Sequence, residues 1–229
     1  MTITLSPNQS DIQTVLRSFL SSILPTNTEI MQGQDNRVGE PAADDFVVFT
    51  VVGHDRLETN FDNPADVSFT GSIAGSTLTV SAVQFGAIGT AGTALFGPGI
   101  LTGTQIVGQL SGTPGGVGAY QVTGTQTVSG ETMASGAISI TQNTRIRMQI
   151  DVHGPASSDN AQTISTVFRD DVACQFFTAS GIDMQPLHAD DPKQIPFQNA
   201  EMQWEYRWVI DAELQANQVV SGIPLEFFT

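Results

Sequence analysis

One long stretch with almost no charge, residues 68–137, most constrains the fold. Glu131 is its only charged residue, and it holds most of the chain's 22 glycines. Short runs such as STLTVSAV, TQIVGQL and AYQVTG alternate between apolar and polar residues and are separated by Gly or Pro-Gly turns, which is typical of short antiparallel strands. A disordered linker is the alternative, but disorder usually comes with high charge and few β-branched residues. We therefore predict a small all-β subdomain at 68–137, inserted into another domain.

The flanking segments, 1–67 and 138–229, are predicted to form one discontinuous domain that begins with a helix. Ser6 is the predicted N-cap of this helix, with Pro7 in its first turn and Gln9 completing a capping box. Pro25 ends it. The apolar positions repeat at helical spacing on one face: Ile12, Val15, Leu16, Phe19, Leu20 and Ile23.

Two strands are predicted on either side of the uncharged stretch. The run Phe46–Val52 is rich in β-branched and aromatic residues, which predicts a central strand covered on both faces. The run TRIRMQIDVHG alternates cleanly, which predicts a strand with one buried and one polar face. The buried face would carry Ile146, Met148, Ile150 and Val152, and the polar face Arg145, Arg147, Gln149 and Asp151.

The C-terminal part is predicted to contain one helix, an edge segment and a final strand. The helix would be capped by Ser157, Ser158 or Asp159 and end at Gly181, with Ile164, Val167, Phe168, Val172 and Phe176 as its apolar stripe. Segment 184–199 contains three prolines and indicates an irregular arm or edge. The final strand would place Trp204, Tyr206, Trp208, Ile210, Ala212 and Leu214 on one face, and Glu205, Arg207, Asp211 and Glu213 on the other.

This order of elements predicts an α/β (α+β) fold. The main domain would be a mixed, mainly antiparallel sheet with helices packed on one face, and the inserted all-β subdomain would add to it.

Composition excludes several classes of protein. The chain has 229 residues, 8 basic and 23 acidic, for a formal charge of −15, so its surface should repel nucleic acid. The single cysteine, Cys174, excludes an internal disulfide and a cysteine-based zinc site. No apolar run is long enough to span a membrane, and the N-terminus lacks the pattern of a secretory signal. We expect a soluble protein, made in a cytosol.

The sequence offers little that indicates catalysis. It lacks a phosphate-binding loop, a GxSxG elbow and an HExxH motif. A hydrolase that uses His153 or His188 is an alternative. Asp151 and Ser157 lie near His153 in the sequence, but a strand-end turn explains the same residues. His188 with Asp190 and Asp191 could hold a hard cation, although a solvated turn explains them better. Cys174 is expected to be a small buried residue. We predict no catalytic residue, no metal and no cofactor.

Outside the uncharged stretch, the sequence resembles the bacteriophage neck/tail terminator family (phage neck terminator protein gp12-like). The resemblance covers most of that part of the chain, in order. It is carried by QGQDNRV (32–38), DFVVFTVVGHDRLETN (45–60), QIDVHGPASSDNAQTISTVFRDDVACQFF (149–177) and MQPLHADDPKQIPFQNAEMQWEYRWVIDAELQ (184–215). The uncharged stretch is similar to a small β module of phage tail and tail-fibre proteins.

This resemblance implies a structural virion protein without enzymatic activity. Such proteins form a ring, expected to be a hexamer, that caps the tail tube and joins it to head-completion (connector) proteins at the neck. Sheath or collar proteins are further expected partners, and genomic DNA passes through the lumen without sequence-specific binding. The protein would be assembled in the host cytoplasm and located in the virion. The uncharged stretch is a departure from shorter members and is expected to decorate the ring.

The residues expected to face the lumen or a neighbouring subunit are the polar ones of the two alternating strands and of the edge segment. They are Arg145, Arg147, Gln149, Asp151, Glu205, Arg207, Asp211, Glu213, Asp190 and Asp191. An alternative function is a glycan- or host-binding module carried by 68–137, in which an exposed Tyr120 would contact the sugar.

Overall fold

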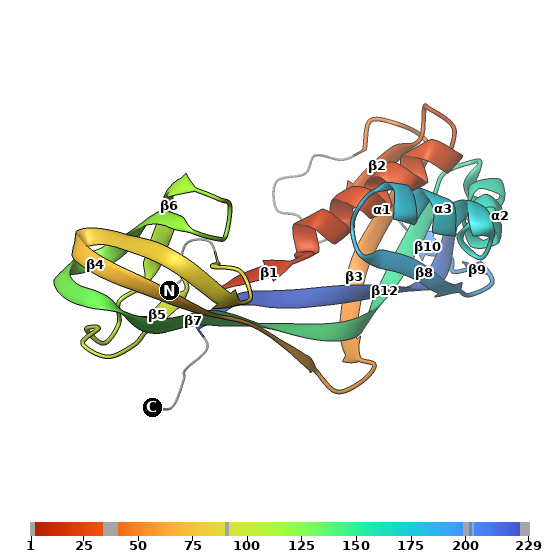
Figure 1. Ribbon diagram of the computed structural model, residues 1–229. Helices are drawn as coiled ribbons and strands as arrows, with labels where there is room; N and C mark the ends of the chain where they lie inside the picture. The colour runs from red at the N-terminus through yellow and green to blue at the C-terminus, as the bar shows by residue number, and fades with distance from the viewer. Residues whose placement is uncertain (1–2, 34–40, 90–91, 199–201, 203, 225–229) are drawn as a thin grey trace. The chain divides into compact units, whose positions relative to one another are not determined.

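The computed structural model divides the chain into two compact units, which are described separately (Figure 1). The first is built from Met1–Ser6, Asn60–Thr141 and Val219–Thr229, and the second from Pro7–Thr59 and Gln142–Gln218. Strands β7 and β12 contribute to both units. The structure describes residues 3–33, 41–89, 92–198, 202 and 204–224, so 34–38 of the QGQDNRV segment and 199–201 and 203 of the last resembling segment lie outside the described residues.

The second unit combines a mixed sheet with three helices among the described residues. In chain order its elements are α1 (Gln9–Ile23), β2 (Glu29–Gln32), β3 (Phe46–Arg56), the last part of β7 (Gly118–His153), α2 (Ser157–Phe168), α3 (Asp171–Ala179), β8 (Met184–Ala189), β9 (Lys193–Gln194), β10 (Phe197–Gln198), β11 (Trp204–Glu205) and the first part of β12 (Arg207–Pro224).

The order of the main strands in this unit is β12-β7-β3-β2. Strands β2 and β3 are parallel, whereas β3 pairs antiparallel with β7, and β8 and β9 pair antiparallel with β12. The short strands β10 and β11 form a separate antiparallel pair. The predicted mixed sheet is therefore confirmed, and the protein as a whole has far more strand than helix.

Apolar residues from the helices and the sheet form one core in this unit. The predicted alternation in β7 is confirmed, because Ile146, Met148, Ile150 and Val152 are all buried there. At its centre the buried ring of Phe19 contacts Phe168, Phe176 and Phe177 of α2 and α3, with ring centroids 5.3–5.9 Å apart. Truncating an aromatic side chain buried in a core to alanine lowers the free energy of unfolding by about 3–5 kcal/mol.

Helix α1 lies where the apolar spacing predicts it, but its cap differs. Ser6 is wrong as the N-cap, because it ends strand β1 and pairs with Val219. The capping box is formed instead by Asn8 and Asp11: the Asn8 side chain accepts from the Asp11 amide at 3.1 Å, and the Asp11 carboxylate accepts from the Asn8 amide at 2.9 Å.

The single helix predicted after the second strand is wrong, because the segment forms α2 and α3. Asp170 lies between them and caps α3, with its carboxylate accepting from the Val172 amide at 3.1 Å. The break turns Val172 out of the predicted apolar stripe, and its side chain is exposed. Gly181 follows the end of α3 as predicted, with a φ of 73°.

The predicted serine or aspartate cap of α2 is also wrong. Ala156 is the N-cap and makes no side-chain capping bond. Asp45, which directly precedes β3, takes that role, since its carboxylate accepts from the Ala156 amide at 2.8 Å. A tertiary contact thus replaces a local cap at this helix end.

Two further predictions of strand burial need correction. In β3, Val47 and Phe49 are buried but Val52 is exposed, so the strand is not covered on both faces along its length. In the final segment, Ile210, Ala212 and Leu214 are buried as predicted, whereas Trp204 and Tyr206 are exposed. These two residues precede β12 and are not part of its core face.

The first unit consists of strands. Its elements are β1 (Thr4–Ser6), β4 (Phe61–Phe85), β5 (Ala94–Phe96), β6 (Ile106–Gly112), the first part of β7 and the end of β12. Strand β4 pairs antiparallel with β7 over most of its length, and β5 and β6 also pair with β7. The runs STLTVSAV and AYQVTG lie in strands, as predicted, and TQIVGQL does so from Ile106 onward. This unit has its own apolar cluster, with Phe69, Leu78, Ile106 and Tyr120 among its fully buried members.

No helix within the described residues is both long and apolar enough to cross a lipid bilayer.

Candidate assembly surface

The polar face of β7 in the second unit carries a network of charged side chains. Because side chains alternate along a strand, Arg145, Arg147, Gln149 and Asp151 lie on the face opposite the buried residues of β7. Arg145 and Arg147 keep 38% and 48% of their side-chain surface exposed, whereas Asp151 keeps 10%. The strand therefore presents accessible guanidinium groups at one part of this face and a nearly buried carboxylate at another.

Asp55 of β3, which the sequence analysis did not single out, holds both arginines. Its carboxylate lies 3.1 Å from Arg145 Nη2 and 2.8 Å from Arg147 Nε. Desolvation raises the pKa of Asp55, but the hydrogen bonds and charges of the two arginines outweigh it, so this pKa lies below its ordinary value of 3.8. Gly53 makes room for the contact, because a Cβ there would lie 2.6 Å from Arg147 Nη2.

A second ion pair connects β7 to β12. The carboxylate of Asp151 accepts from Arg207 Nε at 2.8 Å and from Arg207 Nη2 at 2.5 Å, both at Oδ1. The Gln149 amide donates to the same carboxylate at 2.9 Å. The remaining exposed fractions are 25% for Arg207 and 10% for Asp151, so this pair is far less solvated than the Asp55 contacts.

Arg145 extends the network to β12, because its Nη1 lies 3.6 Å from the Glu213 carboxylate. Charged side chains therefore connect β3, β7 and β12 across one face. Asp211, on the same strand as Glu213, is exposed. The predicted residues of β7 and β12 are brought together here, and most of their charges are paired within the chain.

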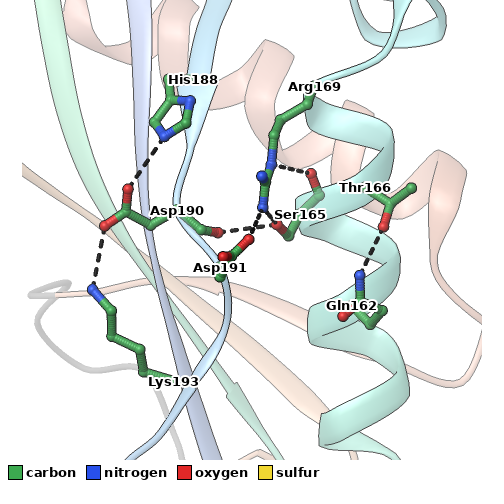
Figure 2. Close-up of polar contacts among 8 residues, drawn as sticks. All are labelled: Gln162, Ser165, Thr166, Arg169, His188, Asp190, Asp191 and Lys193. Carbon is green, nitrogen blue, oxygen red and sulfur yellow. Dashed lines mark hydrogen bonds and ion pairs between the residues drawn. The ribbon is translucent and has the colours of Figure 1, made fainter.

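Asp190 and Asp191 lie elsewhere in the unit, where the turn after β8 meets α2 (Figure 2). Asp190 lies between His188 Nε2 and Lys193 Nζ, each 3.2 Å from one of its carboxylate oxygens. The hydrogen bond from Lys193 is the main reason why the pKa of Asp190 lies below its ordinary value of 3.8. Arg169, the residue that follows α2, binds the Asp191 carboxylate at 2.6 Å.

Ser165 completes this contact from the helix side. Its hydroxyl donates to the main-chain oxygen of Asp190 at 3.0 Å, and its own main-chain oxygen accepts from Arg169 Nε at 3.2 Å (Figure 2). The Asp190 carboxylate therefore joins β8 to β9, whereas the Asp190 main-chain oxygen and the Asp191 carboxylate connect the β8–β9 turn to the C-terminal end of α2. No group of three or more His, Cys, Asp or Glu side chains in the described part of the chain is arranged to hold a metal ion.

His153 ends β7 and packs against the start of β3. Its ring stacks on Phe46, with centroids 4.5 Å apart and an interplanar angle of 5°. Burial lowers the pKa of His153 below its ordinary value of 6.5, with Arg207 acting in the same direction while Asp151 and Glu205 oppose it. This is the environment of a neutral packed side chain at a strand end.

The other two candidates for chemistry also have ordinary surroundings. Cys174 is a free thiol, half-buried in α3 rather than fully buried as predicted. Tyr120 is 1% exposed, and its hydroxyl donates to the main-chain oxygen of Gly116 at 2.7 Å. The prediction of an exposed Tyr120 is wrong, and the sugar contact based on it is lost.

A shallow groove that the sequence analysis missed lies beside His153. It is lined by Asp44, Gly154, Trp204, Glu205 and Tyr206, among others, and has a volume of about 360 Å³. Gly154 has a φ of 101°, and a Cβ there would lie 2.2 Å from the Asp44 main-chain oxygen, so only glycine fits this turn. The alternation of aromatic residues at 204–208 was the available signal, but it predicted core.

Comparison with known proteins identifies the family. A sequence model of the family described as "Phage neck terminator protein" matches residues 103–229, which is more than half of the chain. The match contains all of β7 and β12, and also 103–137, the later part of the uncharged stretch. No curated protein matches the chain. The family is one of structural phage proteins, and the charged face of β7 and β12 lies within the matched residues. The chain belongs to the phage neck terminator protein family.

Proposed function

We propose that this protein forms a closed ring at the neck of a tailed phage, where it caps the tail tube and joins it to the head-completion proteins. The observation that carries the proposal is the family match over 103–229. Subunits in a ring make heterologous contacts, in which two different surfaces of the same protomer meet. We expect the ring to be a hexamer, with the tail tube protein on one side, the connector on the other, and sheath or collar proteins as further partners.

The second unit is suited to this role because its two sheet faces differ. We infer that the helices pack on one face, since their apolar residues share a core with Ile146, Met148, Ile150 and Val152 of β7. The opposite face would then turn toward the lumen or a neighbouring copy. Its candidate residues are Arg145, Arg147, Gln149, Asp151, Arg207, Asp211 and Glu213. Glu205, Asp190 and Asp191 lie elsewhere in the unit and are candidates for contact with a neighbouring subunit.

Charge on this face fits the passage of DNA. Phosphate contacts from unpaired Lys and Arg dominate non-specific DNA binding. Here Arg145, Arg147 and Arg207 are all held by carboxylates of the same chain. A lumen with paired guanidinium groups, in a protein of net charge −15, would give DNA little to adhere to.

The segment 68–137 is proposed to be a separate all-β subdomain that decorates the ring, with 1–67 and 138–229 as the main domain. A cluster of apolar residues confined to Val67–Met133 supports a separate core. Because Tyr120 is buried, no observation favours glycan binding by this segment.

The test is tail length in phage assembled without this protein. A tube that nothing caps continues to grow, so electron micrographs of lysates lacking the protein should show tails of variable, excessive length and no joined heads. Supplying the wild-type chain should restore uniform, head-joined tails. Uniform tails joined to heads in its absence would reject the proposal.

A further inference from the structure

A groove beside β11 has no role in the proposed function. It is lined by Asp44, Phe46, Gly154, Trp204, Glu205 and Tyr206. Trp204 and Tyr206 are 73% and 63% exposed. Exposed Trp and Tyr side chains are unusual on a free surface and are enriched at the centres of protein–protein contacts. The groove is therefore a candidate for a surface that a partner covers.

Two carboxylates in the groove favour a partner that presents a cationic group. Asp44 is exposed beside the aromatic rings, and Glu205 lies in the sequence between them. The nearest imidazole, His153, has its Nδ1 4.0 Å from Glu205, and burial favours its neutral form. Aromatic faces next to carboxylates attract cations. A guanidinium suits the groove better than an ammonium because it is weakly hydrated and stacks on flat rings.

The chain's own cations are a poor source for this contact. Within the described residues, Arg145, Arg147, Arg169, Lys193 and Arg207 each form an ion pair inside the same chain, which leaves the exposed Arg17 and Arg56 as the described cations that a second copy could bring. With a net charge of −15, a second copy would also bring mostly acidic surface to the groove. Charge complementarity favours a basic segment of a different protein.

We propose that this groove binds an arginine side chain presented by a basic segment of a partner protein. The guanidinium would lie against the ring of Trp204 or Tyr206 and donate hydrogen bonds to the carboxylates of Asp44 and Glu205. Gly154 lines the groove, and a Cβ there would collide with the Asp44 main-chain oxygen. That the partner is another protein of the neck rests on the proposed function, whereas recognition of a guanidinium does not.

The test uses the full chain, in which both tryptophans, Trp204 and Trp208, are replaced by 5-fluorotryptophan. The variant Trp204→Phe assigns their ¹⁹F resonances. The protein is titrated with N-acetylarginine amide and, as a matched neutral probe, N-acetylcitrulline amide. The arginine derivative should shift the Trp204 resonance to saturation, and the citrulline derivative should not. Equal shifts with both probes, or no shift with either, would overturn the proposal.

Two variants complete the test. The double variant Asp44→Asn/Glu205→Gln should weaken the arginine-dependent shift on the order of tenfold or more, because both carboxylates are lost. The exposed carboxylate of Asp62 in β4, in the variant Asp62→Asn, is the matched control and should leave the shift unchanged. If the double variant binds as well as the wild type, the assignment is wrong. If the double variant differs from the wild type in sedimentation when no probe is present, a second copy occupies the groove, and the proposal of a foreign basic segment is wrong.

Discussion

Loss of the Arg207 guanidinium should destabilise the protein more than loss of any other arginine of the charged face. The variant Arg207→Gln leaves the Asp151 side chain, which is 10% exposed, with the Gln149 amide as its partner. Breaking a fully buried pair costs about 3–5 kcal/mol. Arg207 keeps 25% of its side-chain surface in solvent, which reduces this cost to about 2 kcal/mol. For a chain of this length, that corresponds to a fall in Tm of about 4–8 °C.

The assay is thermal unfolding of the purified chain, followed by circular dichroism at neutral pH. The matched control is Arg147→Gln, since Arg147 is 48% exposed and its ion pair with Asp55 should contribute at most about 1 kcal/mol. The double variant Asp151→Asn/Arg207→Gln leaves no buried carboxylate unpaired. Its loss in the free energy of unfolding should therefore be about 1–2 kcal/mol smaller than the summed losses of the two single variants. If Arg207→Gln costs no more than Arg147→Gln, the reasoning from burial is refuted.

Three further predictions concern other parts of the structure. Because burial lowers the pKa of His153, the unfolded chain binds a proton more readily than the folded one; stability should therefore fall as the pH drops below 6.5, and His153→Phe should flatten that fall in urea unfolding at a series of pH values. An unchanged slope would show that another group is responsible. The variant Tyr120→Phe should cost about 1 kcal/mol in urea unfolding, since it removes the hydrogen bond to Gly116; no loss would mean that the hydroxyl is not buried and bonded. The variant Asp45→Ala should cost about 1 kcal/mol and lower the hydrogen-exchange protection at the start of α2, because the Ala156 amide loses its acceptor, and normal protection there would contradict the assigned cap.

The parts of the fold that follow from local pattern were predictable from the sequence. The alternation at 145–152 correctly divides β7 into a buried and a polar face, because strand periodicity requires no knowledge of the partner strands. The apolar spacing of α1 likewise places the helix correctly. Its cap was missed because Ser6 is taken by a pairing with Val219, which is more than two hundred residues away in the sequence.

What could not be predicted depends on tertiary contacts. Asp170, a good N-cap residue, indicates the break between α2 and α3 locally. The apolar stripe continues across this position, however, and therefore predicted a single helix. Asp55 was missed because its contact with Arg145 depends on the register between β3 and β7. The groove at Trp204 and Tyr206 was missed because alternation alone does not distinguish an aromatic core face from an exposed one.

An electron cryomicroscopy reconstruction of the phage neck, at a resolution that traces side chains, tests the central claim most directly. We expect a closed ring of this chain between capsid and tail, with the face that carries Arg145, Arg147 and Gln149 turned toward the lumen or a neighbouring copy. A neck that contains no ring of this protein, or a ring in which that face points to bulk solvent, would contradict the account.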